Sequence, residues 1–84
     1  MRPRVVIYSR VGCHLCEEVR ALVDRVAERI ALEIVELDID ADPELRAEFD
    51  TEVPVVELND REIARFRLTE ERLMTALRSA GCVG

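Results

Sequence analysis

Apolar and polar positions along the chain follow two repeats, one typical of strands and one typical of helices. Runs rich in β-branched side chains predict strands at residues 5–9, 32–39 and 53–58. A looser alternation predicts a fourth strand at residues 63–68, joined to the third by a two-residue turn at residues 59–60. The pattern therefore predicts four short strands, the last two of which form a hairpin.

The longest helical pattern begins at about Cys13, soon after the first strand. Apolar residues then recur at steps of three and four, which places them on one face of a helix: Leu15, Val19, Leu22, Val23, Val26 and Ile30. Glu17 and Glu18 fall in the first turn, where carboxylates interact favourably with the positive end of the helix dipole. This segment is therefore predicted to be a long amphipathic helix.

Capping residues predict two shorter helices. Asp42 followed by Pro43 is typical of an N-cap and a first helical position. Thr69 is the predicted N-cap of the last helix, and Gly81 is the residue expected to end it. The inward stripe of that helix is expected to consist of Leu73, Leu77 and Ala80.

The predicted element order is β-α-β-α-β-β-α. Because a helix separates the first two strands, we expect them to be parallel and joined by a right-handed crossover. One mixed four-stranded sheet with helices on its faces accommodates this order, so the predicted fold class is α/β. The length of 84 residues suits a single domain over residues 1–84.

Composition narrows the classes of function. The 18 acidic and 12 basic side chains give a formal charge of −6, and an acidic surface repels nucleic-acid backbones and anionic membranes. The chain has no lysine, which excludes Schiff-base chemistry and a phosphate-binding P-loop. Its apolar runs are far shorter than the roughly 20 residues that span a bilayer. We therefore expect neither a nucleic-acid nor a membrane partner.

The chain contains three cysteines, Cys13, Cys16 and Cys82. An odd number argues against the disulfide framework of a small secreted protein, and the apolar run near the N-terminus is too short for a signal peptide. These features predict a cytoplasmic protein. In that compartment paired cysteines are more often catalytic or metal-binding than structural.

Cys13 and Cys16 form a Cys-x-x-Cys motif between a predicted strand and the helix that follows, a placement typical of redox motifs. Unpaired N–H groups and the dipole at a helix N-terminus stabilise an anion. The pKa of the Cys13 thiol should therefore lie below the free-thiol value of about 8.5. Cys16 lies one turn further along and should be more buried. We predict that Cys13 is the nucleophile and Cys16 the resolving thiol.

Three neighbouring residues have two interpretations each. Arg10 and His14 either favour the Cys13 thiolate through positive charge or are ordinary exposed residues. Glu17 either opposes the thiolate or only stabilises the start of the helix.

Metal binding is the competing interpretation of the motif. Zinc ligands would have to be drawn from Cys13, His14, Cys16 and Cys82. Adjacent residues 13 and 14 point in different directions, and there is no second Cys-x-x-Cys. We therefore assign no metal site. We expect Cys82 to be a bystander thiol, and the alternative is an intermolecular disulfide or a mixed disulfide with a small thiol.

Two segments together resemble the glutaredoxin-like branch of the thioredoxin superfamily. Residues 6–16 read Val-Ile-Tyr-Ser-Arg-Val-Gly-Cys-His-Leu-Cys, and residues 51–56 read Thr-Glu-Val-Pro-Val-Val. With the Asp-Ile-Asp-Ala-Asp-Pro of residues 38–43, the chain is most similar to a small glutaredoxin-like family of unknown function. The resemblance covers nearly the whole chain and implies a sheet order of 2-1-3-4. It also implies a cis Val53–Pro54 peptide bond, which the sequence pattern alone does not decide.

The resemblance also implies binding roles. In the family, the backbone before the cis proline pairs with the thiol substrate, so Val53 and Pro54 are candidate contacts. Arg10 matches the basic residue that glutaredoxins place beside the nucleophile and the glutathione carboxylate. Leu15 falls where they usually carry an aromatic residue.

The chain departs from that family at two places. Residues 64–68 contain no glycine, whereas glutaredoxins have Gly-Gly followed by acidic residues that hold the glutathione amine. Thr69 and Glu70 are the candidates to replace those residues. The centre is Cys-His-Leu-Cys instead of Cys-Pro-Tyr-Cys.

The main hypothesis is a cytoplasmic thiol–disulfide oxidoreductase of cell redox homeostasis, which reduces protein disulfides or glutathione mixed disulfides. No bound cofactor is expected, and glutathione or a reductase would regenerate the dithiol as co-substrate. The expected state is a monomer. The alternative is a thioredoxin-fold binding module, or a metal carrier, without redox turnover.

Overall fold

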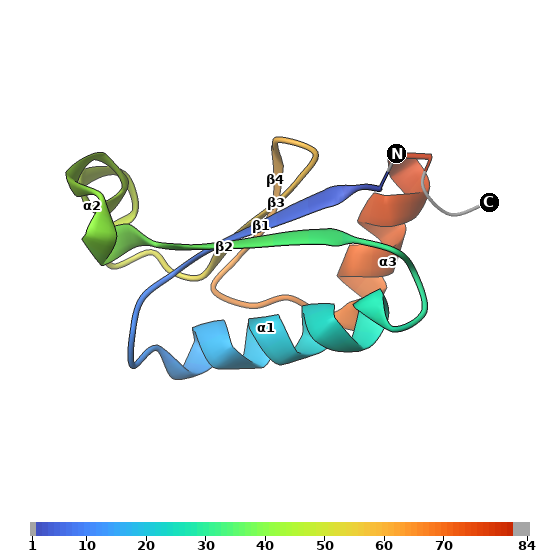
Figure 1. The fold of residues 1–84 in the computed structure, drawn as a ribbon, viewed down its shortest axis with the longest axis horizontal. Coiled ribbons are helices and arrows are strands. Elements are labelled where there is room, and N and C mark those ends of the chain that lie inside the picture. Colours follow the sequence, from blue (N-terminus) through green and yellow to red (C-terminus); the bar gives the residue numbers. More distant parts are fainter. Residues whose placement is uncertain (1, 82–84) are drawn as a thin grey trace.

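A computed structural model describes residues 2–81. Its elements are β1 (Arg4–Ser9), α1 (His14–Ala27), β2 (Glu33–Asp38), the 3-10 helix η1 (Ile39–Ala41), α2 (Pro43–Phe49), β3 (Val55–Leu58), β4 (Arg61–Arg65) and α3 (Glu70–Ser79). Figure 1 shows α1 running along the sheet, with α2 at one end of the molecule and α3 at the other. No helix in this part of the chain is long and apolar enough to cross a bilayer.

The strands form one sheet in the order β2-β1-β3-β4. β1 and β2 are parallel, whereas β3 is antiparallel to both β1 and β4. This arrangement confirms the predicted α/β class and the sheet order 2-1-3-4. Because β1 and β2 are parallel and adjacent, their carboxyl ends meet at one edge of the sheet, where Ser9 is paired with Asp38.

The two faces of the sheet carry separate hydrophobic clusters. The larger cluster joins α1 and α3 to the sheet through Val5, Ile7, Val19, Val23, Val26, Leu32, Val56, Leu58, Leu73 and Leu77. The smaller one lies on the opposite face and joins α2 to the sheet through Ile39, Phe49 and Val55. Adjacent residues of a strand point to opposite faces, so Val55 and Val56 belong to different clusters. Helices therefore cover both faces, as predicted.

Predicted capping residues lie where expected. The side chain of Asp42 accepts a hydrogen bond from the Glu44 N–H at 2.9 Å, with Pro43 as the first residue of α2. The Thr69 hydroxyl accepts one from the Arg72 N–H at 3.0 Å, at the start of α3. Gly81 follows α3 at φ +75°. The side chains of Asp42 and Thr69 each accept a hydrogen bond from a backbone N–H that the first turn of a helix leaves unpaired.

Several element boundaries differ from the predictions. β2 and β3 are shorter than expected, because Ile39 enters η1 and the peptide bond before Pro54 is cis. β4 is Arg61–Arg65 and not residues 63–68, because the turn at residues 59–60 is tight and Phe66 leaves the extended conformation at φ +71°. The fourth strand therefore begins and ends earlier than its hydrophobic pattern predicts.

Two further corrections concern the helices. α1 ends at Ala27, and Ile30 packs partly buried against the core from the following turn, where its N–H donates to the Val26 carbonyl at 2.9 Å. Ala80 was expected on the inward stripe of α3, but it is the C-cap residue and is exposed. Leu73 and Leu77 are fully buried, as predicted.

Candidate functional site

A tight turn places the cysteine pair at the start of α1. The Cys13 N–H donates to the Arg10 carbonyl at 3.2 Å, which closes a four-residue turn. Gly12 occupies its third position at φ +80°, which type II turns require and which glycine adopts without steric cost. The turn reverses the chain after β1, so that the next residue begins the helix.

Cys13 is the N-cap of α1, and its Sγ accepts the Cys16 N–H at 3.1 Å. The two cysteines form a disulfide, with their Cα atoms 5.2 Å apart. Cys13 is partly exposed, whereas Cys16 is 2% exposed and lies on the core-facing side of the helix. The placement of Cys13 at the helix start and the deeper burial of Cys16 are confirmed.

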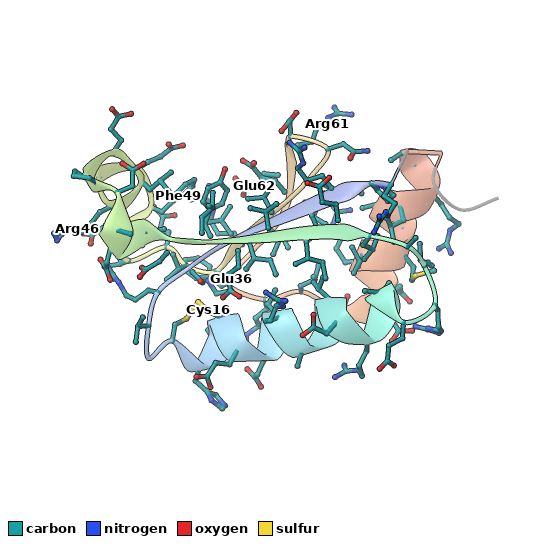
Figure 2. The ribbon with its side chains drawn as sticks, in the orientation of Figure 1. Cys16, Glu36, Arg46, Phe49, Arg61 and Glu62 are labelled. Atoms are coloured by element: carbon teal, nitrogen blue, oxygen red, sulfur yellow. A yellow bond between two sulfur atoms is a disulfide. The ribbon has the colours of Figure 1, made fainter. Side chains whose placement is uncertain are left out.

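A cavity of about 430 Å³ opens beside the disulfide. We call it the disulfide cavity, and it is lined by Ser9, Arg10, Val11, Gly12, Cys13, Cys16, Glu17, Glu36 and Asp38. In Figure 2 the Cys16 and Glu36 side chains lie in the same region between α1 and β2. Its wall is acidic, since it carries three carboxylates and one guanidinium.

A hydrogen-bonded chain holds Glu36 at this cavity. The Ser9 hydroxyl donates to Glu36 Oε2 at 2.9 Å, and Ser9 is a buried polar residue. Arg20 on α1 donates to Glu36 Oε1 at 2.9 Å and to Asp24 at 3.0 Å. This network joins β1, β2 and α1 next to the disulfide.

Arg10 lines the disulfide cavity, but its guanidinium is bound by acidic residues of other elements. Its Nε and Nη2 donate to the two carboxylate oxygens of Asp40 at 2.9 Å each, and its Nη1 donates to the Asp50 carbonyl at 2.8 Å. The hydrogen bonds to Arg10 lower the pKa of Asp40 below its ordinary value, and the same pair raises the pKa of Arg10. The guanidinium is therefore paired with Asp40 of η1 and with Asp50 at the end of α2, and the favourable effect predicted for Arg10 on the Cys13 thiolate remains a prediction.

His14 and Glu17 lie on the exposed side of the first turn of α1. The His14 side chain is 84% exposed, and its Nδ1 lies 3.8 Å from Glu17 Oε1. Glu17 lines the disulfide cavity, but His14 does not. Of the two, only the carboxylate therefore faces the same space as the sulfurs.

A second pocket, of about 210 Å³, lies on the other side of the motif. We call it the Phe66 pocket, and it is lined by Leu15, Glu18, Val19, Phe66, Arg67, Leu68 and Thr69. The structure thus brings Leu15, from within the Cys-x-x-Cys motif, together with Thr69 at the start of α3. Their roles as binding residues remain predictions.

The segment of Val53 and Pro54 is joined to the Phe66 pocket by a backbone hydrogen bond of Pro54. The Val53–Pro54 bond is cis, as the resemblance implies, and the Pro54 carbonyl accepts the Phe66 N–H at 2.7 Å. Pro54 is buried, while Val53 is partly buried against the smaller core cluster. Val53 itself lines neither the Phe66 pocket nor the disulfide cavity, and its substrate contact remains a prediction.

The competing metal hypothesis finds no preformed site in this part of the chain. Within residues 2–81, no three His, Cys, Asp or Glu side chains are arranged to hold a metal ion. Cys82, the remaining sulfur of the hypothesis and the expected bystander thiol, lies outside the described residues.

The sequence pattern did not single out Ser9 and Glu36, which line the disulfide cavity, or Phe66, which shares a pocket with Leu15 of the motif. For Ser9 and Glu36 a signal was present, because two parallel adjacent strands bring their carboxyl-terminal polar residues to the same sheet edge as the motif that follows the first strand. For Phe66 the signal was the missing glycine of residues 64–68, but its positive φ accompanies a hydrogen bond to Pro54, which the local sequence does not display.

Comparison with known proteins agrees with this geometry. The family described as "Glutaredoxin-like domain (DUF836)" matches residues 4–78. The uncharacterized protein Rv0508 of Mycobacterium tuberculosis is 32% identical over 77 residues, which cover 86% of this chain and 79% of that protein.

Two solved structures are similar over almost the whole chain. Protein Ne2328 from Nitrosomonas europaea superposes with a TM-score of 0.77 at 27% identity, covering 90% of this chain and 92% of that one. Thioredoxin from Fasciola hepatica superposes with a TM-score of 0.64 at 25% identity, covering 93% of this chain and 80% of that one. The fold, the disulfide at the start of α1 and the family match together show that the chain belongs to the glutaredoxin-like domain family within the thioredoxin superfamily.

Proposed function

We propose that this protein is a thiol–disulfide oxidoreductase in which Cys13 and Cys16 exchange two electrons with a substrate disulfide. The observation that carries the proposal is the position of Cys13 as N-cap of α1, partly exposed and bonded to a buried Cys16. A thiolate at this position is stabilised by the Cys16 N–H and by the positive end of the helix dipole.

The reaction begins with the reduced pair. The Cys13 thiolate attacks one sulfur of the substrate disulfide, so that a Cys13–substrate disulfide forms and the other substrate sulfur leaves as a thiolate, which takes up a proton. The Cys16 thiol then loses its proton and attacks Cys13 Sγ, which releases the second substrate thiol. The substrate disulfide is reduced to two thiols, and the protein dithiol is oxidised to the disulfide seen here.

The unequal burial of the two sulfurs supports this division of roles. A partner can reach the partly exposed Cys13, whereas Cys16, at 2% exposure, is accessible mainly to a sulfur already held on Cys13. The backbone brings the two Cα atoms within 5.2 Å, within the usual range for a disulfide. Attack by Cys16 therefore needs no rearrangement of the helix.

Regeneration requires two equivalents of a thiol, supplied by glutathione or by a protein reductase. The glutathione-carboxylate role that the resemblance implies for Arg10 would require Arg10 to leave its two-pronged pair with Asp40. Glutathione therefore has to displace an existing ion pair or to bind elsewhere, while a reductase that attacks the disulfide directly does not.

Trapping the mixed disulfide tests the proposal. In a Cys82→Ser background, the reduced Cys16→Ser variant is mixed with 2-hydroxyethyl disulfide and analysed by intact-mass spectrometry. We expect one hydroxyethylthio adduct on Cys13 that persists, whereas the Cys13→Ser variant forms an adduct far more slowly because Cys16 is buried.

The parent with both cysteines should release the adduct and end as the intramolecular disulfide. If neither single variant forms an adduct and the parent does not consume the disulfide, the exchange mechanism is wrong. The binding-module alternative would then account for the fold.

A further inference from the structure

Phe66 adopts a backbone conformation that is unfavourable for a bulky residue. Its φ is +71°, in the left-handed region that glycine adopts freely and aromatic residues rarely adopt. The hydrogen bond from its N–H to the Pro54 carbonyl, at 2.7 Å, holds the segment after β4 in this position. A glycine would satisfy the same backbone geometry without the steric penalty.

Packing of the aromatic ring within the hydrophobic clusters does not offset this steric cost. Phe66 is 42% exposed and belongs to neither hydrophobic cluster. Strained residues of this kind concentrate at functional sites, where the side chain is needed in a particular place. The exposed ring therefore points to a role outside the protein's own core.

Exposed hydrophobic side chains lie on both sides of the Cys-x-x-Cys motif. Among the described residues, three large hydrophobic side chains are exposed: Val11, Leu37 and Phe66. Val11, at 87% exposure, lines the disulfide cavity together with Cys13, and Phe66 lines its own pocket together with Leu15. Two of the three therefore share a hollow with a residue of the Cys-x-x-Cys motif, Val11 with Cys13 and Phe66 with Leu15.

We propose that Phe66 is a specificity-determining residue that selects polypeptide disulfides with an apolar side chain next to the reacting cysteine; this inference rests on the proposed function. A substrate sulfur that approaches Cys13 brings its neighbouring residues onto the surface between Val11 and Phe66. The Phe66 pocket offers apolar walls from Leu15, Phe66 and Leu68, and its volume of about 210 Å³ is suited to a single side chain.

Charge does not select the occupant of this pocket, because Glu18 and Arg67 carry opposite charges at its wall. Burial of apolar area is then the main source of selectivity. Glutathione disulfide and 2-hydroxyethyl disulfide carry no apolar side chain beside the sulfur, so their exchange does not use the ring. The substrate class that benefits from Phe66 is a polypeptide disulfide with Leu, Met or an aromatic residue at that place.

The test measures the oxidation rate of the reduced protein, in a Cys82→Ser background, by three disulfides. Two are disulfide-linked peptides that differ only in having Leu or Ser next to cysteine, and the third is 2-hydroxyethyl disulfide. We expect the parent to react about tenfold faster with the Leu peptide than with the Ser peptide. Phe66→Gly should remove this preference and leave the rate with 2-hydroxyethyl disulfide within about twofold.

Two further variants make the result specific. Phe66→Tyr retains the ring and should retain the preference, and Leu37→Ala removes an exposed hydrophobic side chain that lines neither pocket and should also retain it. Equal rates of the parent with both peptides, or a preference that survives in Phe66→Gly, would overturn the inference. Absence of exchange with all three disulfides would instead overturn the proposed function.

Discussion

Arg10 and Asp40 form a two-pronged ion pair in which Nε and Nη2 each lie 2.9 Å from a different carboxylate oxygen. The pair connects the end of β1, three residues before Cys13, to η1. Fixed pairs of this geometry are stronger than single hydrogen bonds between the same groups. The pair therefore offsets the positive charge of a residue that lines the disulfide cavity.

Asp40→Asn should make Cys13 more acidic. The substitution removes one negative charge beside Arg10, so the potential at the neighbouring cavity becomes more positive and the thiolate is favoured. We expect the midpoint of Cys13 alkylation against pH, in the reduced Cys82→Ser protein, to fall by less than about one unit. Glu62→Gln is the matched control, because it breaks a similar two-pronged pair, with Arg65, that lines neither the disulfide cavity nor the Phe66 pocket, and it changes the net charge equally. An equal fall in both variants would refute a local role of Asp40.

The reduced parent should already show an alkylation midpoint below the free-thiol value of about 8.5. The Cys16 N–H lies 3.1 Å from Cys13 Sγ and stabilises the anion, and the dipole of α1 acts in the same direction. Iodoacetamide rates with peptide mapping report the two thiols separately, and Cys16, at 2% exposure, should react much more slowly. A Cys13 midpoint at or above that of a cysteine in the urea-unfolded chain would contradict the proposed thiolate stabilisation.

Tyr8 should titrate at unusually high pH. Burial, together with a hydrogen bond from its hydroxyl to Glu57 Oε1 at 3.0 Å, raises the pKa of Tyr8 from 10.0 to about 12. Because the chain has one tyrosine and no tryptophan, phenolate absorbance reports this residue alone. Glu57→Gln should move the midpoint towards 10.0, because it removes the negative charge that opposes the phenolate.

The raised pKa of Tyr8 should also make the free energy of unfolding depend on pH in the alkaline range. The unfolded chain loses the Tyr8 proton first, so the free energy of unfolding is at its full value below about pH 10 and should fall as pH rises from about 10 to about 12. Urea unfolding at several pH values measures it. A free energy that is constant across the window would show that Tyr8 titrates alike in both states.

Leu77→Ala should strongly destabilise the fold. Leu77 is fully buried between α3 and the sheet, and removing a buried leucine side chain leaves a cavity at a cost of about 2–5 kcal/mol. Urea unfolding should show a lower midpoint with an unchanged slope. Leu37→Ala is the control, since Leu37 is 37% exposed and should change the free energy of unfolding by much less. Similar losses in the two variants would contradict the assigned core.

Gly12→Ala should destabilise the turn before Cys13 without a steric clash. No atom lies within 4 Å of a Cβ added at Gly12, but φ +80° is a left-handed conformation that costs an L-residue about 1–2 kcal/mol. Asparagine tolerates this region better, so Gly12→Asn should lose less stability. Thermal unfolding measures both variants, and an alanine variant as stable as the parent would argue against a required left-handed residue.

Local features of the fold were predictable from the sequence alone. The N-cap positions of Asp42 and Thr69, and the helix start at Cys13, depend on contacts with residues two or three positions away. The inward positions of Leu73 and Leu77 follow from helical periodicity in the same way. The positions of Cys13 and Cys16, on which their proposed roles rest, were predictable because they depend on a single helix end.

Tertiary structure decided the surroundings of those sulfurs. Arg10 was a candidate partner of the thiolate, but Asp40 and Asp50, 30 and 40 residues away in the chain, bind its guanidinium. The φ of +71° at Phe66 likewise accompanies a hydrogen bond to Pro54, across the β3–β4 hairpin.

The physical reason is the separation along the sequence of the residues that make each interaction. A helix cap or an apolar stripe is determined by the covalent spacing of residues within a few positions, which the sequence displays directly. A long charged side chain, or the backbone that follows a strand, has several partners of similar energy within reach. Only the folded packing of distant segments decides among them.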